Sequence, residues 1–197
     1  MNNNSTQIQC NSCGTVVQTY DGVYLSDERT NHFLCSKCYN ESVSEIMGLN
    51  FDHLSFHPIT LADKENDNHT FHFQTRLIGN NVLIQALEIK DGEPKGYEFS
   101  VHGGEEDDLF YLFRKLIERV RRGLEQRHIE PSDLTPYRIT GEDIVRGHIT
   151  WDDDTGGEVP CLVIDGKELS WHEFGRMLMS YEGFHFKLQI FEGSEEK

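Results

Sequence analysis

Four of the five cysteines form two close pairs, and this spacing limits the possible folds more than any other feature of the sequence. Cys10 and Cys13 make the first C-x-x-C pair, Cys35 and Cys38 make the second, and 21 residues separate the pairs. Tetrahedral zinc binds four thiolates at about 2.3 Å, and a C-x-x-C turn directs two sulfurs towards one point. The separation is close to that of other paired C-x-x-C zinc sites. We therefore predict a structural zinc ion on these four cysteines.

The residues around the two pairs agree with a metal site. Gly14 directly follows the first pair, where the turn needs a residue that accepts a positive φ. Residues 39–47 predict a short helix that ends at Gly48. The N-terminus of this helix lies at the second pair, where the helix dipole favours thiolates. His32 precedes the second pair and stays open as a replacement for one thiolate.

Residues 10–47 resemble a treble-clef or zinc-ribbon finger, with a knuckle, a hairpin through residues 20–30 and a second pair that leads into a helix. The resemblance covers about a fifth of the chain and implies a metal, not a function. Disulfides are disfavoured in the reducing compartment that we expect. A thioredoxin-like motif lacks its βαβ context. A rubredoxin-like iron site remains possible, although the second pair lacks the expected proline and glycine.

The charge of the chain argues against the nucleic-acid partner that many fingers have. The chain carries 34 acidic and 18 basic residues, for a net charge of −16, and residues 10–47 hold five acids and two bases. Nucleic acids and anionic membranes both bind through Lys and Arg. No apolar run approaches the roughly 20 residues of a membrane span. We expect a cytoplasmic protein without a secretory signal, whose partner is another protein with a basic surface.

The rest of the chain predicts an α+β fold in three domains: residues 1–48, 49–130 and 131–197. In the second domain, alternating patterns predict an antiparallel meander with strands over 57–61, 69–77, 82–90 and 97–101. A long helix over 105–127 follows. Its apolar stripe at helical spacing would cover the sheet and comprises Leu109, Phe113, Leu116, Val120 and Leu124.

The third domain is predicted as a β-β-α-β unit. Residues 129–136 are expected to form a linker, followed by strands over 147–151 and 159–164. Ser170 and Glu173 predict a capping box at the start of a helix, and a final strand is expected over 184–190. The buried face of that helix is expected to comprise Trp171, Phe174, Met177, Leu178 and Tyr181. Residues 147–191 resemble a domain of unknown function from uncharacterised bacterial proteins, which implies a bacterial, cytoplasmic origin and no particular activity.

Ten histidines are many for a chain of this length, and they raise a second possibility. His72 and His102 fall on the polar face of neighbouring predicted strands, and Glu98 shares that face. Two imidazoles and a carboxylate could hold a second metal with an open position, as a hydrolytic site requires. The plainer interpretation is the solvated face of an antiparallel sheet.

We interpret the chain as a non-enzymatic protein-interaction or regulatory protein with one structural zinc. The sequence lacks the common nucleophile, phosphate-loop and metalloprotease motifs. The alternatives are a metal-dependent hydrolase that uses His72, His102 and Glu98, and a nucleic-acid-binding finger protein. The sequence leaves the oligomeric state open.

Overall fold

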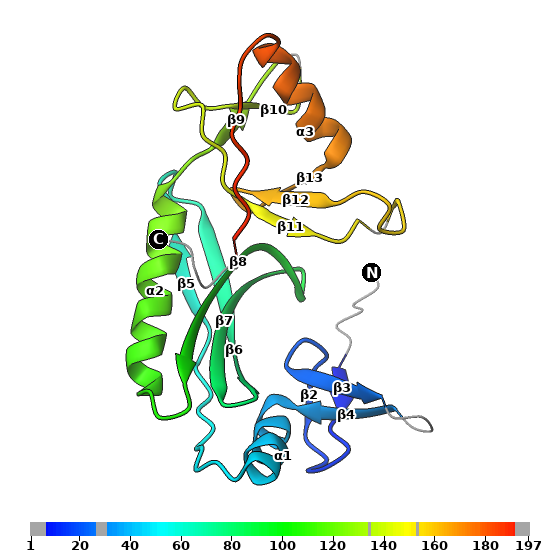
Figure 1. Ribbon diagram of the computed structural model, residues 1–197, viewed down its shortest axis with the longest axis vertical. Coiled ribbons are helices and arrows are strands. Elements are labelled where there is room, and N and C mark those ends of the chain that lie inside the picture. Colours follow the sequence, from blue (N-terminus) through cyan, green and yellow to red (C-terminus); the bar gives the residue numbers. More distant parts are fainter. Residues whose placement is uncertain (1–6, 27–30, 134, 153, 192–197) are drawn as a thin grey trace.

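The computed structural model describes residues 7–26, 31–133, 135–152 and 154–191, and it has the predicted α+β architecture. The described strands form five antiparallel sheets. A small N-terminal module lies at one end, a four-stranded sheet with a long helix lies in the middle, and a C-terminal unit lies at the other end (Figure 1). Among the described residues, no helix is long and apolar enough to cross a membrane.

The N-terminal module consists of two hairpins and one helix. Its elements are β1 (Gln7–Gln9), β2 (Val16–Gln18), β3 (Gly22–Ser26), β4 (Asn31–Cys35) and α1 (Ser36–Met47). β1 pairs with β2, and β3 pairs with β4. The hairpin predicted through residues 20–30 is therefore β3–β4, with residues 27–30 outside the described part. The helix predicted to end at Gly48 does so, because Gly48 takes the left-handed conformation at φ 69°.

The predicted meander is the central sheet. It contains β5 (Ile59–Ala62), β6 (Asn68–Ile78), β7 (Asn81–Lys90) and β8 (Glu93–Gly104), in that spatial order. β8 begins four residues before the expected start at Tyr97. A register shift between Leu87 and Ile89 lets Glu93 and Pro94, which lie between the strands predicted over 82–90 and 97–101, pair with the end of β7.

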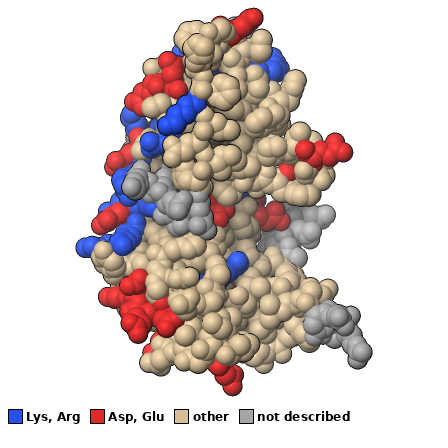
Figure 2. Space-filling view, in the orientation of Figure 1, with Lys and Arg blue, Asp and Glu red and all other residues tan. Residues whose placement is uncertain are grey.

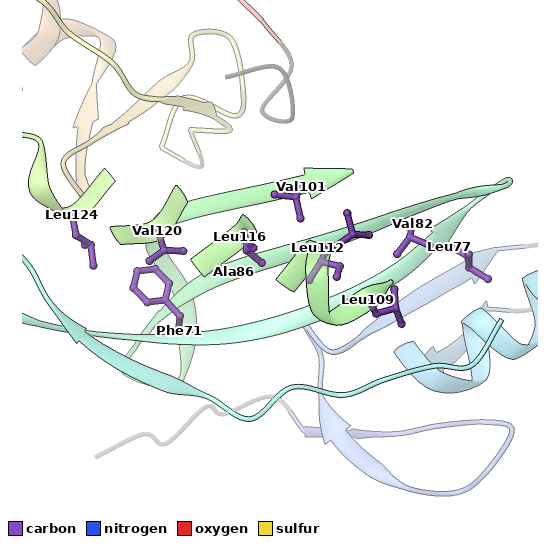
Figure 3. Packing of buried hydrophobic residues seen from close by; sticks show 11 residues of the cluster. Phe71, Leu77, Val82, Ala86, Val101, Leu109, Leu112, Leu116, Val120 and Leu124 are labelled. Atoms are coloured by element: carbon purple, nitrogen blue, oxygen red, sulfur yellow. The ribbon is translucent and has the colours of Figure 1, made fainter. Parts of the chain in front are cut away.

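The long helix covers one face of this sheet. α2 spans Leu109–Glu125 and starts later than residue 105, because the Asp108 side chain accepts the amide of Phe110 and caps the helix. The apolar stripe is confirmed in its main members. Figure 3 shows them packed on the sheet; the buried cluster comprises Phe71, Leu77, Val82, Ile84, Ala86, Val101, Leu109, Leu112, Leu116, Val120 and Leu124.

The C-terminal unit differs from the prediction in three ways. Its elements are β9 (Ile129–Pro131), β10 (Tyr137–Ile139), β11 (His148–Thr150), β12 (Cys161–Ile164), β13 (Lys167–Ser170), α3 (Trp171–Leu178) and the 3-10 turn η1 (Met179–Tyr181). The linker over 129–136 was wrong, because β9 pairs with β10 and Ile129 is buried. The unit gains the unpredicted strand β13 and lacks a strand over 184–190, so the β-β-α-β order was also wrong.

The capping box that begins α3 is confirmed, since Ser170 and Glu173 bond to each other's backbone amides. The predicted buried face of α3 was wrong for two of its five residues, while Phe174 packs against the buried cluster and Tyr181 is half-buried. Met177 is buried, but Trp171 is 48% exposed and Leu178 is 44% exposed. The reason is the small size of the core beneath the helix, whose buried members are Ile129, Ile164, Leu169 and Met177.

The sequence suggested that the face of the central sheet opposite α2 is solvated. In the structure, the N-terminal module covers part of β6 on this face. Arg76 Nη2 donates to the carbonyl of Gly22 at 3.3 Å, and Gln74 between the two modules is buried. The contact between the N-terminal module and β6 could not be predicted, because a strand has the same alternating pattern whether its polar face contacts water or another module.

A buried carboxylate joins β6, β7 and β8 near the C-terminal unit. Glu88 is 2% exposed and accepts hydrogen bonds from His69 Nδ1 at 2.6 Å and from the amide of Tyr97 at 2.8 Å. Lys90 Nζ lies 3.0 Å from the same carboxylate. Gly96 has φ 106°, and a Cβ atom there would collide with the carboxylate, so the close approach requires glycine.

These contacts shift the pKa of both partners. Burial alone would raise the pKa of Glu88, but the hydrogen bonds from His69, Tyr97 and Lys90 outweigh it and lower the pKa below 4.5. The hydrogen bond to Glu88 raises the pKa of His69 above 6.5 against the effect of burial. Asp63 adds to this shift, since its Oδ2 lies 3.4 Å from His69 Nε2.

The His69–Glu88 pair should make a contribution to the free energy of unfolding that depends on pH. A raised pKa means that the contribution of His69 is complete below pH 6.5 and is lost as the pH rises through the folded-state value. We expect His69→Gln to cost about 1.5–3 kcal/mol at low pH, because it removes a charge-assisted hydrogen bond. The difference from wild type should shrink towards alkaline pH in urea unfolding measured from pH 5.5 to 9. His102→Gln, at an exposed position of β8, is the matched control, and a His69→Gln penalty that stays constant with pH would contradict the assignment.

Candidate metal centre

The first cysteine pair lies in a tight turn directly after β1. The turn is closed by backbone hydrogen bonds from the amide of Gly14 to the carbonyl of Cys10 at 3.0 Å and from the amide of Cys10 to the carbonyl of Thr15 at 2.9 Å. Gly14 has φ 74°, as predicted for this position. The turn places Cys10 in the interior and leaves Cys13 exposed.

The second pair lies where β4 meets α1. Cys35 is the last residue of β4 and the N-cap of α1, and Cys38 lies in the first helical turn. Asn11 brings the two pairs together, because its backbone amide donates to the carbonyl of Phe33 at 2.9 Å and its side-chain Oδ1 accepts the backbone amide of Phe33 at 2.7 Å. The predicted closeness of the helix N-terminus to the second pair is confirmed.

The four sulfurs have the separation that a tetrahedral ion requires. The Sγ atoms of Cys10, Cys13, Cys35 and Cys38 all lie within 4.8 Å of one another, and those of Cys13 and Cys35 are 3.9 Å apart. Four sulfurs at about 2.3 Å from one ion would be about 3.8 Å apart. Because this group is made of the four cysteines, His32 is not needed to complete it. The structure thus contains a four-cysteine group positioned to bind a metal ion.

The electrostatics of this group favour a bound cation. A hydrogen bond with the hydroxyl of Thr15 lowers the pKa of Cys13 to about 6, which favours the thiolate. Burial, with the neighbouring Cys13 sulfur, raises the pKa of Cys38 to about 12. One thiolate therefore opposes the ionisation of the next, whereas a bound divalent cation would favour all four thiolates.

The predicted second metal site is not formed. His72 pairs with Leu87, which pairs on its other side with Glu98, so a whole strand separates the imidazole from the carboxylate. Adjacent strands lie about 4.8 Å apart, which puts the two groups about twice that distance from each other. His102 lies four residues further along β8 and faces Leu83. The three side chains share a face, as expected, but they cannot share an ion.

His72 instead lines a cavity between the N-terminal module and the sheet. Its Nδ1 lies 3.1 Å from the hydroxyl of Tyr20, and burial lowers its pKa. The cavity has a volume of about 260 Å³. Its polar lining consists of Gln18, Tyr20, Asp21, Ser36, His53, Ser55, His72 and Thr75. Sequence reasoning missed this site, since its residues come from distant segments and carry no shared spacing.

The cavity contains a hydroxyl, an imidazole and an amide in series, which superficially resembles a catalytic triad. His53 Nε2 lies 3.1 Å from Ser55 Oγ, and His53 Nδ1 lies 2.8 Å from Asn40 Nδ2. Asn40 Oδ1 accepts the amide of Leu77, so the Asn40 amide group must donate to Nδ1. The imidazole proton is then on Nε2 and faces Ser55. A base for Ser55 would need the opposite tautomer.

Asn40 also ties the metal centre to the central sheet. β5 pairs with β6 only as far as Phe71, which leaves the β6 edge open beyond that residue. Asn40 is fully buried and satisfies this edge: its Nδ2 donates to the carbonyl of Thr75 at 2.7 Å, and its Oδ1 accepts the amide of Leu77 at 2.8 Å. Since Asn40 is two residues after Cys38, a member of the four-cysteine group and the sheet contact share one helical turn.

A second group of carboxylates gathers in the loop between β5 and β6 and comprises Asp63, Glu65 and Asp67. Two of its three carboxylates, those of Glu65 and Asp63, already have protein partners. Glu65 forms an ion pair with Arg127, and Asp63 Oδ1 accepts the amides of Glu65 and Asp67. We assign no metal to this loop.

Three family models match successive parts of the chain. A domain of unknown function, DUF7685, matches residues 9–50; a second, DUF7686, matches residues 52–125; and a third, DUF7713, matches residues 128–195. The expected likeness of the C-terminal stretch to a domain of unknown function is confirmed in this general sense. No curated protein and no solved structure matches the chain.

The geometry predicts that metal binding depends on the complete four-cysteine set. Cys35→Ser should lose the metal that wild-type protein retains after purification without chelator, because a serine hydroxyl replaces a buried thiolate ligand. Elemental analysis should then give about one metal ion per wild-type chain and close to none in the variant. Cys161→Ser is the matched control, since Cys161 lies in β12 outside the group. Unchanged metal content in Cys35→Ser would remove these cysteines from the site.

Proposed function

We propose that this protein is a non-enzymatic protein-interaction or regulatory protein, with a structural zinc ion on Cys10, Cys13, Cys35 and Cys38. The observation that carries the proposal is the composition of the group: four sulfurs with tetrahedral separations. Thiolates select zinc among the common cellular divalent ions, and a set of four protein ligands leaves no open position for a substrate. Catalytic zinc sites keep such a position.

The chemistry of the neighbouring cavity supports a role without catalysis. The tautomer of His53 prevents it from accepting the Ser55 proton, and burial lowers the pKa of both His53 and His72. Burial also raises the pKa of Asp21, whose carboxylate accepts a hydrogen bond from Ser36. These groups satisfy one another, which is typical of a structural polar junction.

We further propose that the chain consists of three structural units with boundaries near residues 48 and 130. Support comes from the separate sheets of the three parts and from family matches that change between residues 50 and 52 and between 125 and 128. We also propose a cytoplasmic location. The described cysteines form no disulfide, which fits a compartment that keeps thiols reduced.

The charge distribution supports a basic partner. With 34 acidic and 18 basic residues, the chain attracts positively charged surfaces over a distance set by salt screening. Figure 2 shows acidic side chains in several groups across the visible face, whereas most Lys and Arg side chains there lie along the edge formed by α2.

A peptide pair of opposite charge tests this interaction role. We expect the protein to bind a fluorescent Lys/Arg-rich peptide and not the same peptide with Glu at the basic positions, measured by fluorescence anisotropy. The dissociation constant should rise about tenfold or more when salt increases from about 50 to 500 mM, because screening weakens attraction between exposed charges. Equal affinity for both peptides, or affinity for the basic peptide that salt leaves unchanged, would contradict the proposal.

A further inference from the structure

The end of the described chain exposes an unusual run of large apolar side chains, which we call the C-terminal segment (residues 184–190). Phe184, Phe186, Leu188 and Ile190 alternate along it and are 73%, 91%, 72% and 72% exposed. The residues between them, His185, Lys187 and Gln189, are also exposed. Single exposed apolar residues are ordinary, but a contiguous row of four marks an interaction surface.

The alternation is that of a β-strand with one apolar face. Within the described part of the chain, no strand pairs with this segment, which continues from the end of α3 as an extended trace, red in Figure 1. Gly183, at φ 88°, separates it from η1 and gives the chain a flexible change of direction. The segment therefore has the pattern of a strand and lacks a sheet.

The C-terminal unit contains a sheet edge that lacks a partner strand among the described residues. β11 is an edge strand that pairs only with β12 among the described strands. Ile149 of β11 lies on the same face as Leu162 and Leu169, which face the core under α3. Leu169 is buried, but Ile149 is 52% exposed, so the apolar face continues past the covered core to the open edge.

Charge favours the same match. The C-terminal segment contains Lys187 and no acidic residue, in a chain with a net charge of −16. The turn that follows β11 carries Asp152, Asp154 and Glu158. A strand placed along β11 would bring its lysine towards this acidic turn, whereas an acidic strand would be repelled.

We propose that two copies of this chain form a symmetric dimer in which each C-terminal segment adds a strand to the β11 edge of the other copy. In the described conformation the segment does not pair with β11 of its own chain. In a dimer with one two-fold axis, each segment would pair with β11 of the other copy, so that both edges gain a partner strand. The surface on offer is large: at their exposed fractions the two phenylalanines present roughly 250–400 Å² per segment. Two segments with their aliphatic residues and Ile149 present enough surface for an interface of the standard size of about 1,200–2,000 Å².

The oligomeric state of full-length protein tests the proposal. We expect light scattering coupled to size exclusion to give a dimer for wild type. Phe186→Asp with Leu188→Asp should weaken dimerisation about thirty-fold or more, as for central interface residues. His185→Asp with Gln189→Asp is the matched control, because it places the same two acidic residues on the other face of the strand. A monomeric wild type, or a dimer that the double variant leaves intact, would overturn the proposal.

A complementation experiment tests the pairing of segment with β11. Ile149→Asp alone should also give monomers, since it places a charge on the receiving edge. Mixing this variant with the Phe186→Asp, Leu188→Asp variant should restore dimers, because one intact segment then meets one intact edge. Circular dichroism of each variant checks that it is folded. Failure of the folded variants to complement would overturn the exchange, and would point to segment–segment pairing or to pairing within one chain.

Discussion

The crowding of four cysteine sulfurs is the constraint on which the N-terminal part of this structure depends. The sulfurs lie within 4.8 Å of one another, and three of the four cysteines are buried. A cation that holds them also fixes the knuckle after β1 and the start of α1, because the ligands come from both. α1 in turn presents Asn40 to the open edge of β6. The four-cysteine group and the attachment of the first module to the central sheet therefore depend on the same helix.

Features that arise from local chemistry could be predicted from the sequence. The spacing of Cys10, Cys13, Cys35 and Cys38 predicts that their four sulfurs lie close together. The apolar stripe from Leu109 to Leu124 predicts one buried face of a helix. The capping box at Ser170 was predictable for the same reason, since both partners lie within one turn. In each case the residues that interact are close in sequence or, like the cysteines, share one side-chain chemistry.

Features that arise from tertiary contact could not be predicted. The polar face of β6 has an ordinary alternating pattern, and nothing in it indicates that Tyr20 approaches His72. Residues 129–136 have the composition of a linker, yet the buried Ile129 pairs within a hairpin. The C-terminal segment shows the limit most clearly: its alternating pattern predicts a strand, but a strand also needs a partner strand, and no described strand pairs with residues 184–190.

We infer that a metal ion on the four cysteines holds α1, and through Asn40 the edge of β6, in place. Hydrogen exchange of the zinc-loaded and the zinc-stripped protein, read by mass spectrometry, tests this inference. We expect faster exchange on metal removal in residues 9–48 and at the Leu77 amide that Asn40 protects. Residues 161–178 of the C-terminal unit should be unaffected. Unchanged protection of α1 and Leu77 after the metal is removed would show that the ion does not hold them.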